Sequence, residues 1–253
     1  MFYPLQFEPN LQPVIWGGHQ LRPYKGLEPS DEPIGESWEV SAVPSSTSVV
    51  SNGIWKGKDL ISLINEYPEE ILGKAVNRKY HGQLPLLVKF IDAERDLSIQ
   101  VHPNDDMAQR LHGKMGKPRE LHTALASQAL NFHVEPNYRT EYADAAKKAV
   151  QVIETPYFDV RVMEVSRPFH RELKKYESFI ITMCIEGDCK IRVRSTGDEI
   201  LLTQGNSTLI PAAIADYDII PLNNKTRILD AFIDNMDRSL RHILTRFLHL
   251  TQQ

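Results

Sequence analysis

Leu97–Pro103 reads Leu-Ser-Ile-Gln-Val-His-Pro, and apolar and polar side chains alternate along it. Successive side chains of a β-strand point to opposite faces, so Gln100 and His102 share one face while the apolar residues occupy the other. Pro103 ends the strand because it has no N–H to give to a sheet. The stretch therefore predicts a strand with one apolar and one polar face, which places Gln100 and His102 side by side at the opening of a β-barrel.

The polar pair has two interpretations. A histidine imidazole is a good zinc ligand, and a glutamine carbonyl is a weak neutral ligand that would leave the ion more Lewis acidic. Alternatively, Gln100 and His102 only complete hydrogen bonds with each other or with the backbone inside a barrel. The spacing alone leaves both open.

The rest of the chain predicts mainly β structure. Short segments rich in β-branched residues and bounded by Gly, Pro, Asn or Asp are typical of strands. We expect strands over Glu39–Val43, Thr47–Val50, Leu84–Ile91, Leu97–His102, Tyr157–Val165, Phe179–Glu186, Lys190–Arg194, Glu199–Thr203, Ser207–Pro211 and Arg227–Ile233.

Helical periodicity is confined to a few segments. Asp59–Tyr67 and Glu69–Leu72 predict helices, with Gly73 just beyond the second, where glycine favours the end of a helix. Two more are expected over Leu121–Leu130 and Thr140–Val150. The tail, residues 236–253, is amphipathic; we expect a terminal helix that packs on the barrel or frays, with a membrane-surface helix as the alternative.

Composition limits the function classes. The 253 residues carry a net charge of −4, and their basic residues are spread along the chain, which argues against a nucleic-acid partner. The sequence shows neither a basic, apolar leader nor a run long enough to span a membrane, so we expect a cytoplasmic protein. Cys184 and Cys189 could form a hairpin disulfide, but a reducing compartment favours two free thiols.

Four motifs, taken together, carry a family resemblance. They are Trp16–Gly18 (Trp-Gly-Gly), Gly35–Ser41 (Gly-Glu-Ser-Trp-Glu-Val-Ser), Pro85–Ala93 (Pro-Leu-Leu-Val-Lys-Phe-Ile-Asp-Ala) and the block from Leu97 to His-Pro-Asn-Asp. The chain resembles the type I phosphomannose isomerases (mannose-6-phosphate isomerases), a zinc-dependent family of cupins. The resemblance covers nearly the whole chain before the tail.

The resemblance implies two cupin (jelly-roll-like) β-barrels with a small helical part. The expected domains are residues 1–110, an N-terminal barrel with the metal-site strand; 111–154, a helical junction; 155–235, a metal-free C-terminal barrel; and 236–253, the tail helix. The segments Tyr176–Gly187 and Gly205–Ala213 resemble cupin motifs without their metal histidines, so the second barrel is expected to be structural.

The resemblance also implies an activity. The family interconverts mannose 6-phosphate and fructose 6-phosphate by moving a proton between C1 and C2 through an enediol, so the expected partner is a small sugar phosphate. Gln100 and His102 match two of the family's ligands to one zinc ion. Lys89, on the preceding strand, is a weak catalytic or substrate-binding candidate that could instead face solvent.

Two further residues are candidates for the sugar site. Trp16 and Glu36 are expected at the mouth of the barrel. For Trp16 a packing role is the favoured interpretation, because an indole buries a large area. Glu36 could equally serve only as a hydrogen-bond partner.

One segment departs from the family pattern. Gly113–Thr123 reads Gly-Lys-Met-Gly-Lys-Pro-Arg-Glu-Leu-His-Thr, as though two Gly-Lys sites were joined at Lys117/Pro118 without the residues between them. By resemblance, those residues would carry the third ligand Glu, the fourth ligand His and the catalytic Arg. The alternative function is therefore a catalytically impaired cupin that retains only part of the site.

Glu120 and His122 are the nearest substitutes for the expected ligands. Their spacing would allow chelation from a strand. However, Glu120 lies one residue beyond the family position, and a shift of one residue on a strand reverses the face. We therefore expect them at the surface, at the start of the Leu121–Leu130 helix.

Overall fold

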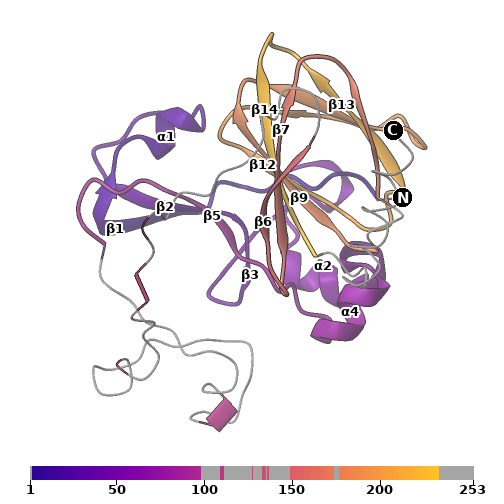
Figure 1. The fold of residues 1–253 in the computed structure, drawn as a ribbon, viewed down its shortest axis with the longest axis horizontal. Helices are drawn as coiled ribbons and strands as arrows, with labels where there is room; N and C mark the ends of the chain where they lie inside the picture. The colour runs from indigo at the N-terminus through magenta and orange to yellow at the C-terminus, as the bar shows by residue number, and fades with distance from the viewer. Residues whose placement is uncertain are drawn as a thin grey trace. The chain divides into compact units, whose positions relative to one another are not determined.

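The computed structural model describes residues 2–97, 149–173 and 177–233, together with residues 109–110, 127, 133–134 and 136. Met1–Glu94 and Glu141–Gln253 form one compact unit, and Arg95–Thr140 form a second. The helices and strands described below all belong to the first unit (Figure 1).

An antiparallel sheet forms the N-terminal part, in the order β1-β2-β5. Its strands are β1 (Leu11–Gly18), β2 (Ile34–Val40) and β5 (Val88–Ile91). The register of β1 shifts between Pro13 and Gly18, where both pair with Ile34, so β1 bulges away from β2. Beyond the bulge, Gly17 bridges to Ala93, which brings the end of β1 against the residues that follow β5.

Short elements lie between the strands of this sheet along the chain. They are α1 (Leu21–Tyr24), β3 (Ala42–Val43), β4 (Ser46–Thr47), a 3-10 turn (Gly53–Trp55), α2 (Leu60–Glu66), α3 (Pro68–Leu72) and α4 (Lys74–Tyr80). Asp59 caps α2 by accepting a hydrogen bond from the Ser62 N–H at 2.8 Å. Gly73 ends α3 with a φ of 91°, and a Cβ there would lie 2.1 Å from the Glu177 carbonyl oxygen, so only glycine fits.

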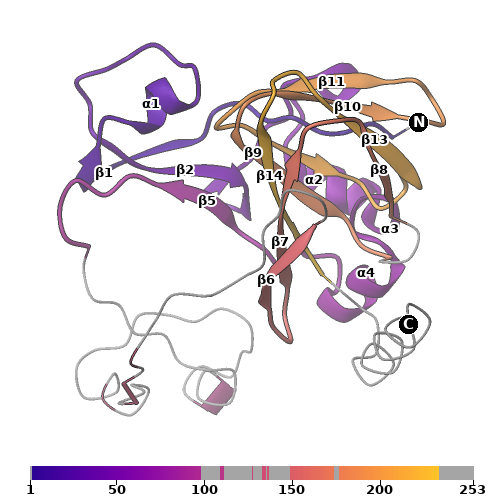
Figure 2. The ribbon, with the colours of Figure 1, turned by 45° about the horizontal axis from the view of Figure 1, so that its top comes forward.

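Two antiparallel sheets form the C-terminal barrel (Figure 2). The five-stranded sheet has the order β12-β9-β14-β7-β6 and the four-stranded sheet the order β11-β10-β13-β8. The strands are β6 (Val150–Glu154), β7 (Asp159–Val165), β8 (Phe169–Glu172), β9 (Ile180–Glu186), β10 (Cys189–Val193), β11 (Glu199–Leu202), β12 (Ser207–Ile210), β13 (Asp216–Pro221) and β14 (Thr226–Phe232).

Two apolar clusters make up most of the core. The first fills the space between the two C-terminal sheets and includes Ile180, Ile191, Tyr217 and Phe232. The second joins the other face of β9 and β12 to the helices, through residues such as Ile181, Leu209, Leu63 and Leu72. Leu5 lies in the second cluster and pairs with Leu209 through two backbone hydrogen bonds of 2.8 and 2.9 Å, so the N-terminal residues extend the five-stranded sheet at β12.

The predicted fold class is confirmed, because the chain is mainly β with few helices. Predicted strands from Tyr157 onward match observed ones to within a few residues, and α2, α3 and Gly73 lie where they were expected. Both cysteines are free thiols, as predicted, and both are buried. The helix predicted over Thr140–Val150 is wrong at Val150, which begins β6 because it pairs with Val162 of β7; residues 140–148 lie outside the described part of the chain.

Several predicted features lie outside the described residues: the Leu97–His102 strand beyond Leu97, the Leu121–Leu130 helix other than Ser127, the Lys117/Pro118 junction and the tail. The domain boundaries remain a prediction. Within the described part of the chain, no helix is long and apolar enough to cross a membrane.

Candidate functional site

A polar cluster on one face of the N-terminal sheet contains two of the predicted site residues. Glu36 and Trp38 are two residues apart on β2, so both side chains emerge on the same face. Lys89 of β5 lies directly opposite Trp38 in the antiparallel register. We call Glu36, Trp38 and Lys89 the β2–β5 cluster.

The Glu36 carboxylate joins the three side chains. Lys89 Nζ donates to Glu36 Oε1 at 2.7 Å, and Trp38 Nε1 donates to Glu36 Oε2 at 2.7 Å. Lys89 Nζ also lies 6.0 Å from the centre of the Trp38 ring, within the range of a cation–π contact. Both oxygens of Glu36 are therefore engaged, and Lys89 is held over an aromatic surface.

The cluster is partly open to solvent. The Lys89 side chain is 32% exposed and that of Glu36 is 16% exposed. Ile91, which follows Lys89 on the same face, is also exposed. A small anionic molecule could therefore reach the Lys89 ammonium group from solvent.

The environment of Glu36 keeps it ionised. Partial burial alone would raise the pKa of the carboxyl, but the hydrogen bonds from Lys89 and Trp38, together with the charge of Lys89, lower that pKa below its ordinary value. A carboxylate with a lowered pKa is a weak base at neutral pH. The geometry therefore suits Glu36 to orienting Lys89 and Trp38 better than to taking a proton from a substrate.

Trp16 packs closely against β2. A Cβ at Gly35 would lie 2.6 Å from Trp16 Cζ3 and 2.2 Å from Val14 Cγ2, so the indole occupies the space that a side chain would need. This contact is the packing role considered for Trp16 from the sequence. A role in substrate binding remains a prediction.

The expected metal ligands are not among the residues described. Gln100, His102 and the substitutes Glu120 and His122 all lie outside them. Among the described residues, no group of three or more His, Cys, Asp or Glu side chains could hold a metal ion. The metal assignment therefore remains a prediction.

A hollow of about 450 Å³ lies elsewhere on the same sheet. Its walls are mostly apolar and come from α1 and the end of β5, including Leu21, Tyr24 and Phe90, with Asp92 as its acidic member. None of the β2–β5 cluster residues lines it. Asp92 is already engaged, since its Oδ2 accepts a hydrogen bond from the Gln20 N–H at 2.6 Å.

The interior of the C-terminal barrel is closed around a buried ion pair. Arg171 Nη2 of β8 donates to Asp230 Oδ2 of β14 at 2.7 Å, and Thr182 Oγ1 of β9 donates to Asp230 Oδ1 at 2.7 Å. Both charged side chains are almost fully buried, and the apolar cluster between the sheets surrounds them. The structural role expected for the second barrel stays a prediction.

Sequence reasoning missed Trp38 as a partner of Glu36. The motif Gly35–Ser41 was recognised, but no role was assigned to its tryptophan. The available signal was the spacing of two residues, which places Glu36 and Trp38 on one face of any strand. Lys25 and Glu39, which pair behind the same strand, gave no local signal because they belong to separate elements.

Comparison with known proteins places this cupin-type arrangement in a family. The profile "Phosphomannose isomerase type I, catalytic domain" matches residues 5–141, and the profile "Mannose-6-phosphate isomerase, cupin domain" matches residues 148–220. The chain thus belongs to the type I phosphomannose isomerase family. The β2–β5 cluster lies within the catalytic-domain match.

Individual relatives agree with this assignment. The mannose-6-phosphate isomerase of Streptococcus mutans is 38% identical over 117 residues, which is 46% of this chain and 35% of the relative. Mannose-6-phosphate isomerase ManA of Bacillus subtilis is 39% identical over 115 residues, 45% of this chain and 35% of that protein. The matched stretch thus spans about a third of the length of these curated relatives.

A solved structure shares the fold. The mannose 6-phosphate isomerase crystal structure from Bacillus subtilis superposes with a TM-score of 0.72 at 21% identity, covering 92% of this chain and 100% of that chain. At this identity the likeness shows a common fold.

Proposed function

We propose that this chain is a mannose-6-phosphate isomerase that interconverts mannose 6-phosphate and fructose 6-phosphate through an enediol. The observation that carries the proposal is the β2–β5 cluster, in which a partly exposed lysine is fixed by Glu36 and Trp38 inside the catalytic-domain match. Family membership supplies the substrate class.

The chemistry requires stabilisation of negative charge. Moving a proton between C1 and C2 generates an oxyanion on the enediol, and the substrate also carries a phosphate. The Lys89 ammonium group would bind one of these anionic groups, with Glu36 holding the side chain in place. Trp38 offers an apolar surface beside it, which would exclude water from one side of the bound sugar.

The proposal includes a zinc ion that Gln100 and His102 would bind. When bound, the ion would supply Lewis acidity to a substrate oxygen. A site with two protein ligands should bind zinc far more weakly than a complete site with three or four. Glu120 and His122 are the candidates for completing it.

Proton exchange tests the activity directly. Mannose 6-phosphate is incubated with the chain and zinc in deuterated water, and loss of the C2 proton is followed by NMR. We expect exchange above the protein-free rate, reduced roughly 100-fold in Lys89→Met if this cation stabilises the developing charge. Lys190→Met is the matched control, because Lys190 also forms a partly exposed ion pair, with Glu199 at 2.6 Å.

The outcomes separate the two functions named from the sequence. Exchange that depends on Lys89 and not on Lys190 supports the isomerase. Exchange at the protein-free rate in the unmodified chain contradicts it and favours the catalytically impaired cupin.

Zinc titration by calorimetry tests the metal part separately. The proposal expects binding that is lost in His102→Ala. Loss of binding in Glu120→Ala as well would identify Glu120 as a substitute ligand. Unchanged zinc binding in His102→Ala would show that His102 is not a zinc ligand.

A further inference from the structure

A buried ion pair lies directly behind the β2–β5 cluster. Lys25, just after α1, donates from Nζ to Glu39 Oε1 at 2.7 Å and to Oε2 at 2.9 Å. The Lys25 side chain is 4% exposed and that of Glu39 is 3% exposed. Lys25 Nζ also donates to the Gly205 carbonyl at 2.5 Å, which ties the pair to the turn before β12.

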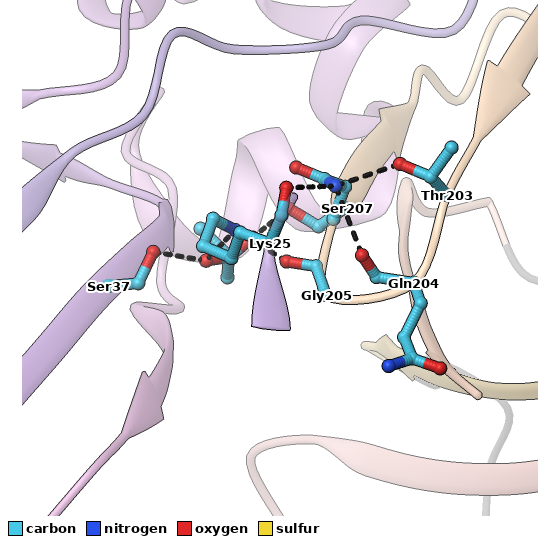
Figure 3. A network of polar contacts seen from close by, with 8 residues as sticks. Lys25, Ser37, Thr203, Gln204, Gly205 and Ser207 are labelled. Atoms are coloured by element: carbon cyan, nitrogen blue, oxygen red, sulfur yellow. Dashed lines mark hydrogen bonds and ion pairs between the residues drawn. The ribbon is translucent and has the colours of Figure 1, made fainter. Parts of the chain in front are cut away.

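Two serines complete the coordination of Glu39. Ser37 Oγ donates to Glu39 Oε1 at 2.6 Å and Ser207 Oγ donates to Oε2 at 2.9 Å. Figure 3 shows Lys25 between Ser37 on one side and Gly205 and Ser207 on the other. We call Lys25, Ser37, Glu39 and Ser207 the Lys25–Glu39 network; it joins α1, β2 and the start of β12.

The network leaves no room for a ligand. The cavity beside it measures about 20 Å³, enough for a water molecule but not for a sugar or a phosphate. Its charges satisfy one another, so it is not a binding site. Its role therefore lies in the strands that it holds in place.

The network holds the strand that carries the candidate site. Side chains alternate along β2: Ser37 and Glu39 point into the network, while Glu36 and Trp38 point to the opposite face. Phe90 of β5 faces Ser37 in the register, and its ring lies 5.6 Å from Lys25 Nζ. The network therefore contacts both strands that bear the β2–β5 cluster, from behind.

Stability is a poor explanation for such a pair. Burying two charges carries a desolvation cost that their attraction often only balances, and apolar replacements of similar volume are frequently neutral or stabilising. Hydrogen bonds with fixed geometry do something that apolar contacts do not, because they define the position of a strand to a fraction of an ångström.

We propose that Lys25 and Glu39 are positioning residues, which fix β2 against the C-terminal barrel so that Glu36 and Trp38 hold Lys89 in the geometry that receives an anionic sugar phosphate. This inference rests on the proposed function for its ligand. The positioning itself concerns only the geometry of the β2–β5 cluster.

The Trp38 indole is a built-in reporter of that geometry. Its N–H donates to Glu36, so the indole resonance in a 1H–15N NMR spectrum is sensitive to the position of β2. The chain has three tryptophans, and replacing each with phenylalanine assigns the signals. Trp55 lies in the second apolar cluster and reports whether a variant is folded.

Two variants disrupt the network to different degrees. The double variant Lys25→Met with Glu39→Leu replaces the ion pair with apolar side chains. Ser207→Ala removes only one hydrogen bond to Glu39 and tests the inference if the double variant does not fold. The matched control is the double variant Arg171→Met with Asp230→Leu, which removes the buried ion pair of the C-terminal barrel.

The inference expects the Trp38 signal to move in both network variants, more in the double variant, while the Trp55 signal stays in place. It expects no movement of Trp38 in the control. Affinity for fructose 6-phosphate, titrated through the same signal, should fall roughly tenfold in the double variant.

An unmoved Trp38 signal in a folded network variant would overturn the inference, as would an equal movement in the control. Failure of fructose 6-phosphate to perturb the unmodified chain would instead count against the proposed function. The response of Trp38 to the network variants, measured without ligand, would still decide the positioning role.

Discussion

The C-terminal barrel and the N-terminal sheet each hold a buried ion pair, but the two pairs have different neighbours. Arg171 and Asp230 lie among the apolar side chains between two sheets. Lys25 and Glu39 lie behind a strand whose other face presents Glu36 and Trp38 to Lys89. The first pair therefore joins two sheets across an apolar core, whereas the second lies directly behind the side chains proposed to receive the substrate.

The largest expected effect comes from breaking the pair inside the barrel. Arg171→Met should lower the free energy of unfolding by about 4 kcal/mol, because the Asp230 carboxylate would stay buried with Thr182 as its remaining hydrogen-bond donor. Urea denaturation measures the change. Recovery of most of the loss in the double variant with Asp230→Leu is expected, and a loss below about 1 kcal/mol in the single variant would contradict this account.

A smaller loss is expected at the N-terminal pair. Lys25→Met should lower the free energy of unfolding by about 3 kcal/mol, since Glu39 would keep the hydroxyls of Ser37 and Ser207 as donors. The same urea experiment tests it. A loss equal to or greater than that of Arg171→Met would reverse the order proposed for the two regions.

The packing behind the candidate site can be tested at Gly35. In Gly35→Ala the new Cβ would clash with Val14 and with the Trp16 ring, so a loss of about 2 kcal/mol is expected, together with a change in tryptophan fluorescence. Gly197→Ala is a control for the loss of a glycine, because a Cβ at Gly197 would meet nothing within 4 Å, although its φ of 76° adds backbone strain. Fluorescence that changes equally in both variants would argue against the Trp16 contact.

The smallest effect on stability is expected at Lys89. Lys89→Met removes a partly exposed ion pair and should cost less than about 1 kcal/mol. Because the pKa of Glu36 is lowered in the folded chain, the contribution of this pair is complete above the ordinary carboxyl pKa of about 4.3 and is lost as the pH falls through the lowered value.

The pH dependence of the free energy of unfolding tests the Lys89 prediction. In urea denaturation, the free energy of unfolding of the unmodified chain should exceed that of Lys89→Met at pH 7. This difference should shrink as the pH falls into the acidic range. A difference between the two chains that stays constant with pH would show that the ion pair does not lower the pKa of Glu36.

Much of the fold was predictable because its signals are local. The β-branched runs predicted the strands of the C-terminal barrel, helical periodicity over Asp59–Tyr67 predicted α2, and Gly73 indicated the end of α3. The strand β1 was missed because Leu11–Gly18 contains a proline and two glycines, residues that weaken strand signals and here accompany a bulge. Val150 was wrongly predicted to be helical because its pairing with β7 is a contact that the local pattern does not contain.

The candidate site was predictable in part. Motifs pointed to Glu36 and Lys89, and the structure brings them together. The Lys25–Glu39 network was not predictable, because Lys25 contacts Gly205, 180 residues further along the chain. A contact of that kind depends on the packing of the complete fold, and no spacing along the sequence indicates it.

The bridge between Leu5 and Leu209 bears on how the chain can be divided. Residues at the very start of the chain hydrogen-bond to β12, and the apolar face of β9 and β12 is covered by the helices that precede the second matched profile. A fragment beginning near residue 148 would expose both a row of unpaired backbone groups and that apolar face, the two features that most promote aggregation. The residues of the two matched profiles therefore contribute to one shared core.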